Sequence, residues 1–229
     1  MKIFIKTIVI IVCFTQAIVL AQTTKIDLNQ KLPIDTHLII GKLSNGLTYY
    51  IRANQKPEKR AIFYLAVNAG SVLETDDQVG LAHFTEHMGF NGTKQYPGNT
   101  LIDELEKKGI VFGREINAYT SFDETVYYVT LPTDDSVLFN MGLKILDGWA
   151  FGMLMTEKEI DKERGVIIEE WRTRVGAGNR LREKTLPIEL KGAKYVDRLP
   201  IGTLENLQQF TYASIRNYYK TWYRSDNMA

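Results

Sequence analysis

The chain has 229 residues, 45% of them hydrophobic, which is enough to bury a core in one large domain or a tight pair of domains. Its 28 lysines and arginines nearly balance 27 aspartates and glutamates, so the net charge is +1. This composition excludes a disordered polar tail, and it gives no support for a nucleic-acid partner or for binding to an anionic surface.

The first 21 residues are predicted to be an export signal that is removed after Ala21. Lys2 and Lys6 precede an apolar run from Thr7 to Leu20, which is shorter than the roughly 20 residues of a membrane-spanning helix. We therefore expect a protein of the periplasm or cell envelope, with no stable membrane anchor after cleavage. Residues 22–35 are polar and patternless, and they are expected to form an exposed leader.

The predicted folded part begins with strands. Residues 37–43 and 47–53 flank Asn45-Gly46, a pair that supplies the positive φ angles of a tight hairpin turn. Residues 61–67 form a third strand, whose nearly continuous apolar character predicts burial on both faces. Further strands are predicted at residues 117–120 and 125–131.

Helices are predicted at residues 79–90, in a segment after Pro97, at residues 137–149, from the capping box Thr156–Glu159 onward, and at residues 212–223. In the third of these, Val137, Met141, Ile145 and Trp149 recur at helical spacing as the apolar stripe. Hairpin strands mixed with long amphipathic helices predict an α+β fold. We expect a mainly antiparallel sheet with helices packed on one face, formed by residues 36–229.

The motif His83-Phe84-Thr85-Glu86-His87 carries the chemistry of the chain. On a helical wheel of about 100° per residue, His83, Glu86 and His87 share one face. The apolar residues of the same helix lie nearly opposite and are expected to pack into the core: Leu81, Phe84 and Met88.

Histidines and carboxylates must hold any metal, because the single cysteine, Cys13, lies inside the export signal. Two imidazoles at positions i and i+4 suit zinc, whose catalytic sites use three protein ligands. Glu86 is placed to act as a general base toward a water molecule that zinc activates. His37, the third histidine of the chain, is expected to be structural.

A carboxylate from another element should supply the third ligand, and the helix after Thr156 offers five: Glu157, Glu159, Glu163, Glu169 and Glu170. Ile160, Ile167 and Trp171 align as its buried stripe, and Glu163 and Glu170 lie within about 20° of each other at the edge of that stripe. Glu169 points into water. Glu163 and Glu170 are therefore the candidates, one as ligand and the other as a supporting carboxylate.

These motifs resemble those of the inverted-motif zinc peptidases, the family of pitrilysin, insulin-degrading enzyme and the mitochondrial processing peptidase. The resemblance begins at Gly41-Lys42-Leu43-Ser44-Asn45-Gly46-Leu47 and ends at Asp226-Asn227-Met228-Ala229. It is strongest to large bacterial secreted zinc proteases, on the segments Asn117-Ala118-Tyr119-Thr120-Ser121 and Glu169-Glu170-Trp171-Arg172.

The resemblance implies one zinc ion per chain, held by His83, His87 and Glu170. It implies that Glu86 is the catalytic base and that Glu163 is an assisting catalytic glutamate. The segment Asn117, Ala118, Tyr119 and Thr120 resembles the edge strand that binds a peptide or an unfolded polypeptide by strand addition.

Members of this family close a chamber from two or four such domains. The resemblance therefore implies further domains of the same chain or a partner subunit, and a catalytic domain truncated at its C-terminal end. The predicted function is a zinc-dependent metalloendopeptidase. Three alternatives stay open: a non-catalytic binding or scaffold subunit of a peptidase complex, an inactive fragment of a larger protease, and a zinc hydrolase that acts on something other than a peptide.

Overall fold

The computed structural model describes residues 29–174 and 176–229. The predicted export signal and the first part of the predicted leader lie outside the described residues. Residues 29–36 form neither helix nor strand and are exposed, and they belong to a different compact unit from residues 37–229. In the part of the chain that the structure describes, no helix combines the length and apolar character needed to cross a bilayer.

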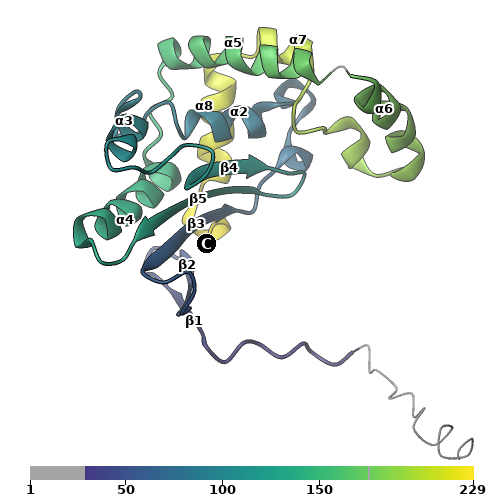
Figure 1. Cartoon of the computed structure of the whole chain (residues 1–229). Coiled ribbons are helices and arrows are strands. Elements are labelled where there is room, and N and C mark those ends of the chain that lie inside the picture. Colours follow the sequence, from purple (N-terminus) through teal and green to yellow (C-terminus); the bar gives the residue numbers. More distant parts are fainter. Residues whose placement is uncertain (1–28, 175) are drawn as a thin grey trace, which may run out of the picture. The chain divides into compact units, whose positions relative to one another are not determined.

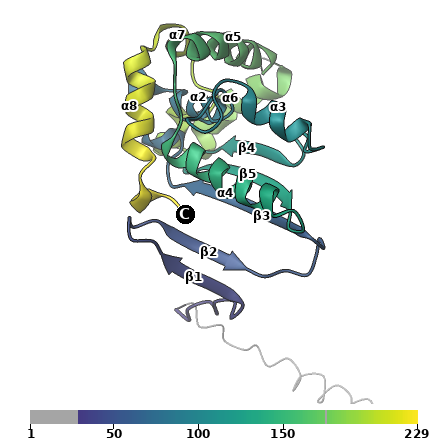
Figure 2. The ribbon, with the colours of Figure 1, turned by 90° about the vertical axis from the view of Figure 1, so that its left-hand side faces the viewer.

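Residues 37–229 contain two antiparallel sheets (Figure 1, Figure 2). The predicted hairpin is present as β1 (Leu38–Lys42) and β2 (Thr48–Arg52). The second sheet has the strand order β3-β5-β4 and consists of β3 (Arg60–Val67), β4 (Ile116–Thr120) and β5 (Thr125–Pro132). The strand β4 is therefore an edge of this sheet.

β3 is buried on one face only, so the prediction of burial on both faces is wrong. Phe63 and Leu65 are buried, whereas Ile62 and Tyr64 beside them are 48% and 55% exposed. On the same open face, the ring centroids of Tyr64 and Tyr128 lie 5.8 Å apart. An isoleucine and a tyrosine count as apolar in a sequence pattern, although a tyrosine tolerates a half-solvated position because its hydroxyl can reach water.

The helices lie on the other face of this sheet, which confirms the predicted α+β class (Figure 2). They are α2 (Leu81–Met88), α3 (Thr100–Glu106), α4 (Ser136–Phe151), α5 (Glu157–Thr173), α6 (Ala177–Glu189), α7 (Leu204–Gln209) and α8 (Tyr212–Trp222). α2 and α4 contact the sheet, and α5 and α8 pack against α2. Neither α6 nor α7 was predicted from the sequence.

The apolar stripe of α4 differs from the prediction at its first residue. Val137 is 67% exposed, and Leu138 is buried together with Met141, Ile145 and Trp149. On a helical wheel Val137 lies about 80° from the centre of the buried set, whereas Leu138 lies close to that centre. The i, i+4 spacing from Val137 to Met141 therefore pointed to the wrong first residue of the stripe.

Trp149 of α4 fixes the C-terminal end of α2 to the core. Its ring nitrogen donates a hydrogen bond of 3.0 Å to the carbonyl oxygen of Gly89, the residue that ends α2. Tyr127 of β5 stacks on Trp149 with the ring centroids 5.2 Å apart. A Cβ atom added at Gly89 would lie only 2.8 Å from a ring carbon of Tyr127. The glycine therefore allows the close packing that holds α2 in place.

Candidate metal centre

The helix α2 presents the motif because its opposite face is buried. Leu81, Phe84 and Met88 are almost completely buried, as the helical wheel predicts. The carboxylate of the buried Glu74 caps the N-terminal end of the helix. Its oxygens accept hydrogen bonds from the backbone N–H groups of Gly80 at 3.0 Å and of Ala82 at 2.7 Å. Burial raises the pKa of the Glu74 carboxyl to about 8, and these two hydrogen bonds act against the shift.

α5 brings its carboxylates to α2 in the same way. Ile160 and Ile167 are completely buried, and they turn Glu163 and Glu170 toward the two histidines. The side chain of Glu169 is 66% exposed and pairs with Arg172. The structure therefore places all three glutamates where the wheel predicts them.

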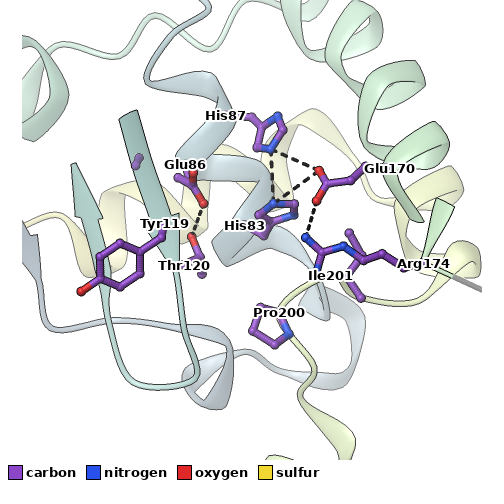
Figure 3. Close-up of a pocket in the computed structure, with 10 residues that line it drawn as sticks. His83, Glu86, His87, Tyr119, Thr120, Glu170, Arg174, Pro200 and Ile201 are labelled. Carbon is purple, nitrogen blue, oxygen red and sulfur yellow. Dashed lines mark hydrogen bonds and ion pairs between the residues drawn. The ribbon is translucent and has the colours of Figure 1, made fainter. Parts of the chain in front are cut away.

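Three ligand atoms converge between α2 and α5 (Figure 3). The Nε2 atoms of His83 and His87 lie 3.2 Å apart, and Oε2 of Glu170 lies 3.7 Å and 3.6 Å from them. Zinc bonds of about 2.0–2.1 Å in a tetrahedron separate neighbouring ligand atoms by roughly 3.3–3.4 Å. The donor types and their spacing therefore fit a zinc ion.

Glu163 does not join this group but contacts its outer side. Oε1 of Glu163 lies 2.7 Å from Nδ1 of His87, and Asn91 donates a hydrogen bond of 2.8 Å to Oε2. Because an ionised carboxylate only accepts, Nδ1 of His87 carries the hydrogen and Nε2 is left with its lone pair for a metal. The geometry therefore assigns different positions to the two candidate carboxylates. Glu170 faces the two histidine Nε2 atoms, and Glu163 contacts His87 from the other side.

The two histidines have opposite pKa shifts. Burial, together with the charge of His87, lowers the pKa of His83 to about 4. Burial also acts to lower the pKa of His87, but the hydrogen bond to Glu163 and the nearby carboxylates outweigh it, and the pKa is raised. His83 is therefore neutral at pH 7 and ready to bind a cation, whereas the raised pKa of His87 means that a proton competes with a cation for this residue as the pH falls.

Glu86 projects into the pocket beside these ligands. Thr120 of β4 donates a hydrogen bond of 2.7 Å to its Oε2 atom. Burial raises the pKa of the Glu86 carboxyl, and the Thr120 hydrogen bond only partly offsets this. A carboxylate with a raised pKa is suited to accept a proton near neutral pH.

The pocket itself has a volume of about 280 Å³. It is lined by His83, Glu86, His87, Ala118, Tyr119, Thr120, Glu170, Arg174, Pro200 and Ile201. Of the predicted substrate residues, Asn117 does not line it; its side chain accepts a hydrogen bond of 2.9 Å from the backbone N–H of Ala118. His37 precedes β1 rather than lying in it, and it is exposed and outside the pocket lining.

Several residues of the site were not predicted. Arg174 lies four residues after Glu170 and pairs with its Oε1 atom, a helical spacing that the sequence could have revealed. Asn91 lies four residues after His87, which is the same signal. Pro200 and Ile201 carry no such signal, because a contact between distant glycines, Gly80 and Gly202, brings their loop to α2.

An α+β domain with two histidines and a carboxylate around a metal position, and a glutamate beside them, has the architecture of a zinc peptidase domain. The chain belongs to the insulinase family (peptidase family M16), whose family model matches residues 49–191.

Known relatives support this assignment. A probable zinc protease PqqL of Haemophilus influenzae is 39% identical over 213 residues, which cover 93% of this chain and 23% of the relative. The crystal structure of the first half of the periplasmic protease PqqL from Escherichia coli matches with a TM-score of 0.84 at 42% identity, over 87% of this chain and 42% of that one. The structure of a mutant of the ferredoxin protease FusC, in complex with Arabidopsis ferredoxin, matches with a TM-score of 0.77 at 28% identity. The match covers 83% of this chain and 21% of the FusC chain. This chain thus spans less than a quarter of the length of the Haemophilus relative.

Proposed function

We propose that residues 36–229 form the catalytic domain of a zinc-dependent metalloendopeptidase with one zinc ion per chain. The observation that carries the proposal is the convergence of His83, His87 and Glu170, with ligand atoms 3.2–3.7 Å apart, beside the Glu86 carboxylate. The relatives that are named as zinc proteases support the same chemistry.

In this proposal His83, His87 and Glu170 hold the zinc, and Glu163 orients His87. Zinc, when bound, supplies Lewis-acid activation of water and of a peptide carbonyl group. Glu86 receives the proton of the attacking water and returns it to the leaving amine. Thr120 occupies Oε2 of Glu86, so we assign the proton transfer to Oε1.

The edge strand β4 favours a peptide substrate over other carbonyl compounds. Its outer side has no neighbouring strand among the described residues, and Ala118, Tyr119 and Thr120 line the pocket. An extended peptide that adds to this edge would lie beside the metal ligands and be bound through its backbone, with little dependence on sequence. We propose that Asn117 also contacts the bound peptide, because it lies in the same edge strand, although it does not line the pocket. The substrates are thus peptides or unfolded polypeptides, and the complex of the relative FusC with ferredoxin is consistent with a polypeptide substrate.

We also propose that this domain works with further domains of the same chain, or with a partner subunit, that close the pocket. The much greater length of the relatives supports this arrangement. The predicted export signal, together with the periplasmic protease PqqL as a relative, supports export to the periplasm or cell envelope.

The variant Glu86→Gln tests the proposal in the natural full-length protein. We expect it to bind zinc with the wild-type stoichiometry and to lose peptide hydrolysis, because the amide cannot accept the proton. The matched control is Glu169→Gln, the same change on an exposed glutamate, and it should keep full turnover. Wild-type turnover by Glu86→Gln would show that Glu86 is not the base. Zinc binding without hydrolysis by the wild-type protein would favour a scaffold subunit.

A further inference from the structure

The side chain of Asn91 bridges the C-terminal end of α2 and the carboxylate of Glu163. Its Nδ2 atom donates to the carbonyl oxygen of His87 at 3.1 Å and to Oε2 of Glu163 at 2.8 Å. The other carboxylate oxygen of Glu163 lies 2.7 Å from Nδ1 of His87. Asn91, Glu163 and His87 therefore form a closed ring of contacts behind the ligand cluster.

Only a primary amide of this length satisfies both acceptors of the ring. Each of the two hydrogens on Nδ2 serves one oxygen, and the buried Glu163 carboxylate has both of its oxygens paired as a result. A leucine at position 91 would leave Oε2 of Glu163 without this donor. An aspartate would place a second carboxylate against it.

The two histidines differ in how they are held. Nδ1 of His83 is buried and has no hydrogen-bond partner within residues 29–174 and 176–229, and the polar contacts of this ring are made by Nε2, with His87 and Glu170. His87 differs because its Nδ1 is held by a hydrogen bond to Glu163. Whatever fixes the rotation of the Glu163 carboxylate thus fixes which nitrogen of His87 carries the hydrogen and where Nε2 points.

We propose that Asn91 is a positioning residue of the metal centre, which locks the Glu163 carboxylate so that Nε2 of His87 faces the metal. Asn91 acts through Glu163 and touches neither metal nor substrate. Glu170 lies two turns beyond Glu163 along α5. This inference rests on the proposed zinc site.

The test compares Asn91→Leu with Asn140→Leu. Asn140 also donates to the carbonyl oxygen four residues earlier, Ser136 at 2.8 Å, but it lies on α4 and outside the pocket lining. We expect Asn91→Leu to weaken zinc binding by about 10- to 100-fold, measured by competition with a chelator, and Asn140→Leu to leave it unchanged. Wild-type zinc affinity in Asn91→Leu, or an equal loss in both variants, would overturn the proposal.

Two further measurements separate positioning from a general loss of structure. Nitrogen NMR of the zinc-free protein, at a pH where His87 is neutral, should show the hydrogen on Nδ1 in the wild type and a mixture of both tautomers in Asn91→Leu. In a Glu163→Leu background the Asn91→Leu change should cost little more, because its route to His87 is already gone. An unchanged tautomer, or a full additional loss of affinity, contradicts the proposal.

The isosteric variant Asn91→Asp covers the case in which Asn91→Leu does not fold. It should also weaken zinc binding, since two carboxylates then face each other, and wild-type affinity in this variant would overturn the proposal. A wild-type protein that binds no zinc would instead refute the proposed function. Failure of the Asn91 proposal and failure of the proposed function therefore give different results.

Discussion

Glu170 and Glu169 are neighbours in sequence with opposite surroundings, and replacing each by alanine is a direct test of the metal site. Oε2 of Glu170 lies 3.6 Å and 3.7 Å from the two imidazole nitrogens, whereas Glu169 points to solvent and pairs with Arg172. Both changes remove one negative charge from α5. The net charge of the chain therefore changes equally in the two variants, and only one of them loses a carboxylate at the metal position.

The expected difference is large. Zinc sites with four protein ligands bind with about 10–16 kcal/mol, so that one ligand accounts for about 3 kcal/mol or more. Loss of Glu170 should therefore weaken zinc binding by roughly a hundredfold or more. Loss of the exposed Glu169 removes a surface ion pair and should change the dissociation constant by less than about twofold.

Competition with a chelator of known affinity, at fixed pH and ionic strength, measures both constants in the same preparation. Circular dichroism of each variant shows whether the overall helix content is retained. Equal zinc affinities of the two folded variants would refute the assignment of Glu170 as the third ligand, and with it the argument from helix geometry.

Further predictions concern acidity and packing. Thr120→Val removes the hydrogen bond that opposes the raised pKa of Glu86, so the acid limb of kcat/KM against pH should move up by about one to two pH units; an unchanged limb would contradict the contact. Because the pKa of His87 is raised, zinc affinity should already fall as the pH drops toward about 6.5, and a flat affinity down to that pH would refute the shift. Phe84→Ala should lower the free energy of unfolding by about 3–5 kcal/mol in urea titrations, against about 0.5 kcal/mol for the partly exposed Phe151→Ala. Similar losses in the two variants would show that the buried face of α2 is not part of the core.

Helix periodicity accounts for what the sequence could predict of the site. A helix fixes the direction of each side chain once its buried stripe is known, and Ile160 and Ile167 define that stripe clearly. The placement of Glu163 and Glu170 at its edge, and of Glu169 in water, followed without any tertiary information. The wheel could not say which of the two edge carboxylates faces the histidines, because this depends on how far α5 slides along α2.

The rest of the site depends on contacts between segments that are distant in sequence. Pro200 and Ile201 reach the pocket through a loop whose path is set by the approach of Gly202 to Gly80. No local pattern encodes such an approach. The wrong prediction that β3 is buried on both faces has a related cause. An apolar run cannot show whether helices cover one face of the sheet or both, and Tyr64 lies on the face that they leave open.

One physical cause, the removal of water, prepares two different groups of the site. Burial keeps His83 neutral and raises the pKa of Glu86, so the same dry environment makes one residue a ligand and the other a base. Burial acts to lower the pKa of His87 as well, but the hydrogen bond to Glu163 and the nearby carboxylates raise it, so that a proton competes with zinc for this residue. The orientation of His87 is thus obtained at some cost in zinc affinity at low pH. Protein that covered the pocket further would therefore raise the pKa of Glu86 still more, and the hydrogen bond from Thr120 is the largest effect that opposes this rise.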